Sequence, residues 1–541
     1  MNRKTVGVMA LITIAVACLP LFTINCIGGH DILYHLLRID ALKSGIQNGL
    51  PFLRVNLLFF GGMGYASSMF YPDFLLYLPA VLRALGAGID LSFHIFVAFC
   101  IIAGFTSAYF SMKTVTRGRL APLCCAMIFT LYQYFLDDIF TRSAVGEYTA
   151  MLFLPLVLAG LYDLIFLEFK KPYLLGLGMA GIILCHTLTT LLALVLCLAA
   201  VLICCRRLLK SPGKLLKLCL TALCVLCATS FYWLPMLEQM ASSSFQYANS
   251  IFDLQYERML LKDVFQNRHP GMGLAIFLLL APRLFLKKRS DLIRFADLCL
   301  LAAFLFILCT TGLFPWGRLQ DELSFIQFPW RLFAVTGPLL AFAEAIYLDA
   351  FQELLPSAPW SKEASCLLCA TAVLIVMTVS AIQTQGRNDQ EYYSYSDDYF
   401  DYAPYTGNVI GGEWLPMGAT DRDSLTTDAP FALLPDGKKV EVLRDRNSLS
   451  LTGLDSSLSY VDVPFLYYKG YRAASLAGNP LKLDGSGENG RVRVYPDGAE
   501  GIYVSYGGTA LQKASTWISL LTLLGVLGLG FYKKRKGAPK E

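Results

Sequence analysis

Charged residues are scarce in this chain. Asp, Glu, Lys and Arg make up 16% of its 541 residues, whereas 55% of the residues are hydrophobic. Soluble domains carry about 25% charged residues, so the composition excludes an ordinary soluble protein. The formal net charge of +5 does not indicate a nucleic-acid partner, because the basic residues gather in short loops between apolar runs. The composition therefore predicts a polytopic membrane protein that binds no nucleic acid.

Cysteine is absent after Cys369, and histidine occurs only five times. All 16 cysteines lie in or at the edges of apolar segments, where they serve as small apolar residues. The scattered histidines do not form a zinc-binding set. The sequence also lacks a Walker loop, a Gly-x-Ser-x-Gly elbow, a His-Glu-x-x-His motif and a Rossmann glycine pattern. The sequence therefore contains none of these signature motifs of soluble enzymes. The missing Walker loop argues against an ATP-driven pump.

Apolar runs bounded by Lys and Arg predict an all-α membrane domain of about 12 transmembrane helices. The predicted spans are 5–27, 91–113, 120–136, 148–168, 173–188, 190–205, 215–236, 272–286, 294–312, 328–349, 364–382 and 515–532. The run 173–205 can also be one tilted helix, but splitting it near His186 keeps the basic loops on one side. Both termini are then predicted to be cytoplasmic, and the first run is predicted to be a retained anchor.

Three domains follow from these spans. Residues 1–382 are predicted to form the polytopic membrane domain, with a large first external loop at 28–90. Residues 383–514 carry 12 Lys and Arg against 18 Asp and Glu, and alternating runs within them predict a small β-rich extracytoplasmic domain. Residues 515–541 are predicted to be the final transmembrane helix and a basic cytoplasmic tail. The apolar stretch 74–85 is too short to span and predicts a re-entrant or interfacial helix.

A cluster of ionisable residues follows the first apolar run, in the sequence Gly-His-Asp-Ile-Leu-Tyr-His-Leu-Leu-Arg at 29–38. In a helix, Asp31, His35 and Arg38 would share one face. A carboxylate there can act as a general base toward an acceptor hydroxyl, with His30 or His35 orienting it. Asp31 can equally cap the helix that begins there. The residues alone leave both interpretations open.

Two further charged clusters are predicted at the same external face. Arg142 and Glu147, with Asp137 and Asp138, form one of them. Its carboxylates can bind a divalent cation that bridges a diphosphate, or Arg142 can hold a phosphate directly. The alternative is a salt bridge that fastens a loop to the start of a helix. Arg331, in Gln-Phe-Pro-Trp-Arg, can hold a lipid-linked phosphate or serve as an interfacial anchor.

The order of these short motifs resembles that of the bacterial YfhO-like membrane proteins, which are also labelled 6-pyruvoyl-tetrahydropterin-synthase-related membrane proteins. The resemblance runs from about 28 to 510, and nothing in the chain supports pterin chemistry. Besides the cluster at 29–38, the matching motifs are Phe-Tyr71-Pro, Arg142-x-x-x-Gly-Glu147, Gln-Phe-Pro-Trp-Arg331, Gly-Gly-Glu-Trp-Leu-Pro416 and Pro464-x-x-Tyr-Tyr-Lys-Gly-Tyr471.

That family is similar in layout to the GT-C glycosyltransferases, which move a sugar from a polyprenyl-phosphate donor to an acceptor outside the cytoplasm. The resemblance implies a GT-C-like glycosyltransferase in the bacterial cytoplasmic membrane, with Asp31 in the place of the catalytic acidic residue. We predict catalytic roles for Asp31, His35 and Glu147. The predicted substrate-binding residues are His30, Arg38, Tyr71, Arg142 and Arg331.

The partners implied are a polyprenyl-phosphate-linked sugar, membrane lipid, and an envelope glycan or polymer acceptor. A divalent cation is the one cofactor left open. One alternative is a lipid or polymer transporter or flippase, which needs ionisable residues near the membrane midplane and broken helices in corresponding halves. Another is a non-catalytic envelope scaffold whose external domain binds glycan.

Overall fold

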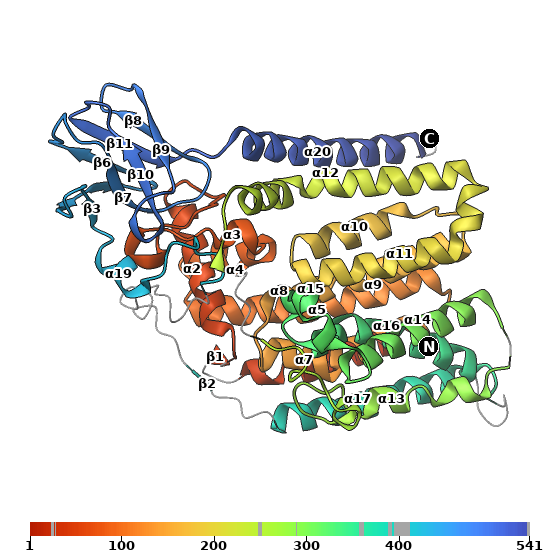
Figure 1. The fold of residues 1–541 in the computed structure, drawn as a ribbon. Helices are drawn as coiled ribbons and strands as arrows, with labels where there is room; N and C mark the ends of the chain where they lie inside the picture. The colour runs from red at the N-terminus through yellow and green to blue at the C-terminus, as the bar shows by residue number, and fades with distance from the viewer. Residues whose placement is uncertain are drawn as a thin grey trace. The chain divides into compact units, whose positions relative to one another are not determined.

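The chain divides into two compact units, each discontinuous in sequence. Figure 1 shows the helices and strands coloured by residue number from the N-terminus to the C-terminus. The computed structural model describes residues 1–22, 26–27, 29–246, 252–287, 289–355, 362–387, 392–393 and 412–537. The first unit comprises Met1–Ile32, Asp90–Val225 and Ser250–Tyr395, and the second comprises Leu33–Ile89, Leu226–Asn249 and Ser396–Glu541. The domain ranges expected from the sequence stay predictions.

The first unit is almost entirely helical. Its α-helices are α1 (Arg3–Ala17), α5 (Ile89–Val115), α6 (Leu120–Leu131), α7 (Gln133–Phe140), α8 (Val145–Met151), α9 (Leu154–Phe166), α10 (Pro172–Ile183), α11 (Thr187–Leu209), α13 (Ala275–Leu278), α14 (Asp291–Thr310), α15 (Gln320–Leu323), α16 (Phe333–Gln352) and α17 (Lys362–Arg387). Short 3-10 helices are η1 (Leu19–Phe22), η5 (Leu261–Phe265), η6 (Ala281–Phe285), η7 (Trp316–Arg318), η8 (Ser324–Ile326) and η9 (Pro329–Leu332). The strands β1 (Cys26–Ile27) and β2 (Tyr392–Tyr393) pair antiparallel. Helix α12 (Pro212–Ser242) runs from the first unit into the second.

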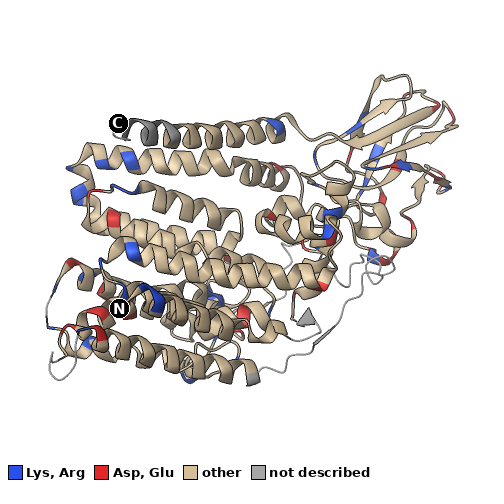
Figure 2. Cartoon of the chain, turned by 180° about the vertical axis from the view of Figure 1, so that it is seen from behind, with Lys and Arg blue, Asp and Glu red and all other residues tan. Residues whose placement is uncertain are grey.

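Among the described residues, eight helical segments are long and apolar enough to cross a membrane, which supports the prediction of a multi-pass membrane protein. They are Ile89–Val115, Val145–Phe166, Thr187–Leu209, Pro212–Ser242, Asp291–Thr310, Pro329–Gln352, Lys362–Gln385 and Ala510–Gly530. Each coincides with one predicted span. A ninth span exists if α6 and α7, which meet at a bend of 43°, cross together. Residues coloured as Lys, Arg, Asp or Glu are sparse along these helices (Figure 2).

The other three predicted spans, 5–27, 173–188 and 272–286, fold as shorter helices. Helix α1 ends at Ala17, just before Pro20, whose ring removes a backbone donor. The segment 272–286 divides into α13 and η6 for a similar reason, because Pro282 lies inside it. Helix α10 ends at Ile183 because His186 caps α11, accepting a hydrogen bond from the Thr189 amide. The predicted break near His186 is thus confirmed.

Helix α16 lies at the centre of the first unit. It packs against α6 and α14. In the apolar segment Pro329–Gln352, which contains α16, 94% of the most apolar stretch is buried inside the protein. Glu344 on this helix is fully buried, and neither of its carboxyl oxygens has a hydrogen-bond partner among the described residues. Burying an unpaired polar group is unfavourable, and burying an unpaired charge is far more so.

We therefore expect Glu344→Met, which keeps the side-chain volume, to raise the free energy of unfolding by about 1–3 kcal/mol. The measurement is the midpoint of thermal unfolding of the purified protein in detergent. Glu353→Met is the matched control, because Glu353 is exposed at the end of the same helix and should leave the midpoint unchanged. A lower midpoint for Glu344→Met would show that the carboxyl has a stabilising partner.

The second unit contains the C-terminal β domain. Its strands are β3 (Phe431–Leu433), β4 (Lys439–Glu441), β5 (Leu443–Asp445), β6 (Ser448–Thr452), β7 (Val461–Leu466), β8 (Tyr471–Ser475), β9 (Pro480–Asp484), β10 (Arg491–Tyr495) and β11 (Gly501–Tyr506). They form one antiparallel sheet in the order β4-β3-β7-β10-β9-β8-β11-β6-β5. Two alternating runs that predicted strands are β10 and β11, so the β-rich part of the fold prediction is confirmed.

The helices of this unit come mostly from the first loop and the C-terminus. They are α2 (Ile32–Gln47), η2 (Phe59–Gly62), α3 (Ser67–Phe70), η3 (Phe74–Leu76), α4 (Tyr77–Ala84), α19 (Arg422–Thr427), η10 (Glu488–Gly490) and α20 (Ala510–Gly537). Helix α20 runs beside the C-terminal part of α12, where the Ser230 and Ser519 hydroxyls lie 3.0 Å apart (Figure 1). The stretch 74–85 forms only a short helix, as expected from its length.

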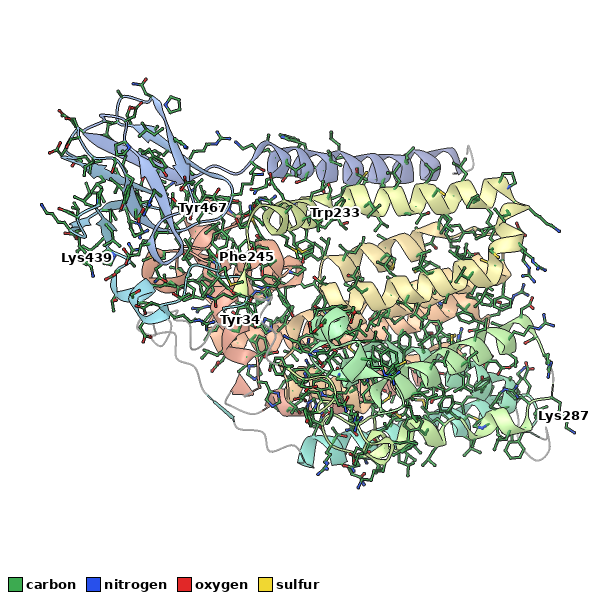
Figure 3. The ribbon with its side chains drawn as sticks, in the orientation of Figure 1. Tyr34, Trp233, Phe245, Lys287, Lys439 and Tyr467 are labelled. Atoms are coloured by element: carbon green, nitrogen blue, oxygen red, sulfur yellow. The ribbon has the colours of Figure 1, made fainter. Side chains whose placement is uncertain are left out.

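The first loop packs on the β domain through the motifs noted in the sequence. Phe70 stacks on Trp414 with ring centroids 4.6 Å apart, and Phe245, labelled in Figure 3, contacts Phe70 edge-on at 4.8 Å. Gly62 has a φ of +113°, and its carbonyl accepts a 2.8 Å hydrogen bond from Arg444. A Cβ there would lie 3.1 Å from the Arg444 Cζ, so this approach requires glycine. These motifs therefore build the interior of the second unit.

Candidate active site

The turn between α7 and α8 pairs with the segment that carries Asp31. The Asp31 amide donates to the Arg142 carbonyl at 2.9 Å, and the His30 amide donates to the Thr141 carbonyl at 3.3 Å. A Cβ at Gly29 would lie 2.2 Å from the Ser143 hydroxyl oxygen, so only glycine permits this approach. Two segments that are far apart in the sequence, one with Asp31 and one with Arg142, are thus paired through their backbones in the first unit.

Arg142 is the centre of a buried charge network. Its Nη1 donates to Glu147 Oε2 at 3.0 Å and pairs with the Asp138 carboxylate. The Tyr134 hydroxyl donates to Glu147 Oε1 at 2.6 Å. The side chains of Arg142, Asp138 and Glu147 are 4%, 0% and 2% exposed. The salt bridge that the sequence allowed is therefore present, and one guanidinium compensates two buried carboxylates.

Arg331 approaches the same network but is less engaged. Its Nε lies 3.8 Å from Glu147 Oε2, and its side chain is 16% exposed. This Nε has no hydrogen-bond partner in the part of the chain that the structure describes. The guanidinium also lies 5.2 Å from the centre of the Phe328 ring. Arg331 therefore keeps donor capacity that Arg142 has already used.

Asp31 lies within the electrostatic reach of both arginines and of Glu147. Burial raises the pKa of its carboxyl above the usual range, and the positive charges of Arg142, Arg331 and His30 only partly offset that rise. The residue as a whole nevertheless remains partly exposed. A carboxyl with a raised pKa in a partly exposed residue suits a general base. Asp31 also directly precedes α2, so the capping interpretation stays open.

The rings of Trp330 and His269 border the network, and neither residue was among the site residues predicted from the sequence. The Arg142 guanidinium lies 4.6 Å over the Trp330 ring, and His269 meets the same ring edge-on at 4.9 Å. His30 and His269 are 5.9 Å apart. Burial and the Arg142 and His30 charges lower the pKa of His269 to about 3, so its ring is neutral at physiological pH. His269 lies between the predicted spans 215–236 and 272–286, just before the second one, and this position was the available sequence signal.

The remaining predicted site residues belong to the second unit. Arg38 pairs with the Asp73 carboxylate, and its Nη2 donates to the carbonyls of Tyr71 at 3.2 Å and Pro72 at 2.8 Å. Its Nη1 lies 3.1 Å from His35 Nδ1. Arg38 and His35 are each 2% exposed. These contacts fasten the Phe-Tyr-Pro loop to α2, which is a structural role, and roles in substrate binding or catalysis remain predictions.

The structure groups the predicted residues accordingly. His30, Asp31, Arg142, Glu147 and Arg331 come together in the first unit, whereas His35, Arg38 and Tyr71 cluster in the second.

Two of the carboxylates that were candidates for a metal site are already paired with an arginine. Across the described ranges, no group of three His, Cys, Asp or Glu side chains is arranged to hold a metal ion. The carboxylates of Asp138 and Glu147, which were candidates to bind a divalent cation, already share the positive charge of Arg142. A divalent cation stays a prediction from the sequence.

Comparisons with known proteins place most of the chain in one family. The model described as "Family of unknown function (DUF6541)" matches residues 4–408. An uncharacterized protein of Lactococcus lactis subsp. cremoris is 27% identical over 259 residues, which cover 46% of this chain and 42% of that protein. The chain thus spans less than half the length of that curated relative.

Two solved structures are similar at low identity. The archaeal oligosaccharyltransferase AglB from Archaeoglobus fulgidus, in complex with an inhibitory peptide and a dolichol-phosphate, is 13% identical with a TM-score of 0.41, covering 74% of this chain and 57% of that one. Arabinofuranosyltransferase AftD from Mycobacteria is 15% identical with a TM-score of 0.41, covering 71% of this chain and 27% of that one. The GT-C-like layout and the YfhO-like resemblance remain expectations from the order of the motifs. By the match over residues 4–408, the chain belongs to the DUF6541 family.

Proposed function

We propose that this protein is an integral membrane glycosyltransferase that moves a sugar from a polyprenyl-phosphate donor to a hydroxyl-bearing envelope acceptor. The observation that carries the proposal is the grouping of Asp31 with Arg331, Arg142 and Glu147 in the first unit. A carboxyl with a raised pKa beside a guanidinium with a spare donor supplies a base and a phosphate ligand together. The order of the sequence motifs supports the same class.

In the proposed reaction, Asp31 accepts the proton of the acceptor hydroxyl. The hydroxyl oxygen forms a bond to the anomeric carbon, and the bond from that carbon to the phosphate oxygen breaks. The phosphate leaves with the electron pair, and Arg331 stabilises its charge. Since phosphate is a good leaving group, the protein needs mainly to position the reactants and to stabilise charge.

Arg142 and Glu147 have a positioning role in this scheme. Two carboxylates already occupy Arg142, so it is poorly suited to bind phosphate itself. Glu147 lies between Arg142 and Arg331 and holds the second guanidinium by charge. The distribution of basic loops supports placing this site on the extracytoplasmic side, with both termini in the cytoplasm.

Reconstitution tests the proposal. The purified full chain is placed in liposomes with a panel of synthetic polyprenyl-phosphate hexoses and pentoses labelled in the sugar, together with neutral oligosaccharides. We expect label to move from the lipid fraction into water-soluble product for at least one donor. If label crosses the bilayer while it remains attached to lipid, the protein is a flippase. If no donor loses its label, the transferase proposal is wrong.

A further inference from the structure

The end of the first loop buries its charged side chains. From Tyr71 to Ile89 the only charged residues are Asp73 and Arg83. Arg83 Nη2 donates to Asp40 Oδ1 at 2.8 Å, and Asp73 pairs with the Arg38 guanidinium. The four side chains are between 2% and 9% exposed. Both charges of this segment therefore point inward and pair with α2.

The exposed side of the same segment is apolar. Phe74, Val81 and Leu85 are 48%, 44% and 81% exposed. Their spacing of seven and then four residues places them on one face of a helix. A helix that faces water normally exposes its charges and buries its apolar residues. Helix α4 and its ends show the opposite arrangement, which indicates that this face does not face water.

Phe52 extends the apolar face from a second segment. It is 83% exposed, and its ring centroid lies 6.3 Å from that of Tyr77 on α4. The Tyr77 hydroxyl donates to the Pro51 carbonyl at 2.7 Å, which fixes this segment against the helix. We refer to four exposed residues of the second unit as the apolar patch, namely Phe52, Phe74, Val81 and Leu85.

Arg54 links the segment of Phe52 to two helices that can cross a membrane. Its Nη1 and Nη2 each donate to the Phe231 carbonyl of α12 at 3.2 Å, and Nη2 lies 3.3 Å from the Thr516 hydroxyl of α20. The Phe231 carbonyl is available because Pro235, four residues later in the helix, has no N–H to donate. Phe231 and Thr516 both lie within the apolar segments of these helices. Arg54 therefore contacts the membrane-spanning part of the second unit.

Tryptophans occur at the same level of both helices. Trp517 directly follows Thr516 on α20 and is 63% exposed. Trp233, labelled in Figure 3, comes two residues after Phe231 on α12. Tryptophan is enriched where a membrane meets water. The contacts of Arg54 thus lie near the membrane boundary.

The chain ties both ends of the apolar patch to membrane helices. Phe52 precedes Arg54 by two residues. At the other end, the segment Ile89–Val115, which can cross a membrane, begins four residues after Leu85. Four residues reach at most about 14 Å when fully extended. The patch therefore cannot lie far from the bilayer at either end.

We propose that the apolar patch is a membrane-docking surface that inserts into the interfacial region of the lipid leaflet beside Arg54 and Trp517. An uncharged apolar face is the surface that an interfacial helix presents to lipid. The sequence also allowed a re-entrant helix at 74–85. The buried pair of Arg83 and Asp40 argues against it, because a re-entrant helix would carry both charges into the hydrocarbon. This proposal does not depend on the proposed glycosyl transfer.

Photocrosslinking in a bilayer tests the docking surface. Phe52 or Leu85 is replaced by the photoreactive amino acid benzoylphenylalanine in the full chain. Each protein is placed in nanodiscs of phosphatidylcholine and phosphatidylglycerol and illuminated. Intact-protein mass spectrometry then shows what each position contacts. We expect the mass of a phospholipid to be added at both positions.

Leu476 is the matched control position. It is 57% exposed and follows β8 in the same unit. The other end of β8 pairs Tyr471 with Tyr506, whose hydroxyl lies 3.0 Å from Gln512 of α20. Leu476 therefore lies at the end of β8 away from that helix. Benzoylphenylalanine at this position should gain no lipid.

Two results would overturn the docking surface. One is the absence of a lipid adduct at positions 52 and 85, including the case in which these positions crosslink to a second copy of the chain. The other is equal labelling of position 476, because lipid would then reach any exposed apolar residue. Thermal unfolding checks that each variant folds, and if one patch variant does not, the other decides the result.

Discussion

Asp31→Asn is expected to lower the rate of glycosyl transfer by about 10²- to 10⁴-fold, which is the usual contribution of a general base. Asparagine keeps the size of the side chain but cannot accept the proton of an acceptor hydroxyl. The change alters one carboxyl, on a residue that is partly exposed. We therefore expect folded protein at the wild-type level, together with unchanged binding of donor and acceptor.

The pH dependence of the rate provides a second measurement for the same change. Because the pKa of Asp31 lies above its usual value of 3.8, the carboxyl takes up a proton as the pH falls toward that raised value. A base must be unprotonated to act, so the wild-type rate should fall with decreasing pH. The Asn variant should lack this acid limb. The His269 ring is neutral above about pH 3, because burial and the charges of Arg142 and His30 lower its pKa to about 3.

Asp253→Asn is a suitable control for both measurements. Asp253 is an exposed carboxylate of the first unit that caps a local turn through the Gln255 amide. Its substitution should change neither the rate nor the acid limb. A wild-type rate for Asp31→Asn would leave the helix-capping role as the explanation for this residue.

Arg142→Met is expected to have the largest effect on stability. The substitution leaves the carboxylates of Asp138 and Glu147 buried without the guanidinium that compensates them. Breaking a buried ion pair by removing one partner costs about 3–5 kcal/mol. Little folded protein should therefore be recovered, and thermal unfolding of the purified material in detergent is the measurement. Adding Asp138→Asn and Glu147→Gln should restore part of the lost stability.

Arg331→Met is the matched comparison. Arg331 contacts the same Glu147 at 3.8 Å with 16% of its side chain exposed, so its loss removes one weak ion pair. We expect nearly normal stability and a severe loss of transfer, because this guanidinium is assigned to the phosphate. Equal destabilisation by the two arginine substitutions would show that Arg331 is also structural. Normal stability of Arg142→Met would contradict the buried network.

The structure explains why the short motifs of the sequence divide into two groups. The Arg142 to Glu147 motif and Arg331 meet in the first unit, where they form a charged site. The motifs around Phe70 and Trp414 instead stack on each other inside the second unit. Motif order alone presented all of them as candidates for one function. Only their contacts separate residues that can do chemistry from residues that hold a loop on a sheet.

Local features of this protein were readable from the sequence. Apolar length predicted the long membrane helices, and alternation predicted β10 and β11, because both patterns depend on residues close together in the chain. Contacts between segments far apart in the chain could not be predicted from the sequence. That Asp31 would join Arg142, and that Arg38 would give its donors to the carbonyls of Tyr71 and Pro72, depends on backbone positions fixed only by packing. The sequence by itself determined a multi-pass membrane protein with a cluster of charges after its first apolar run and a C-terminal β domain. The tertiary structure decided which of those charges neutralise each other and which remain available, because burial and pairing, rather than residue type, set the energy of a charge.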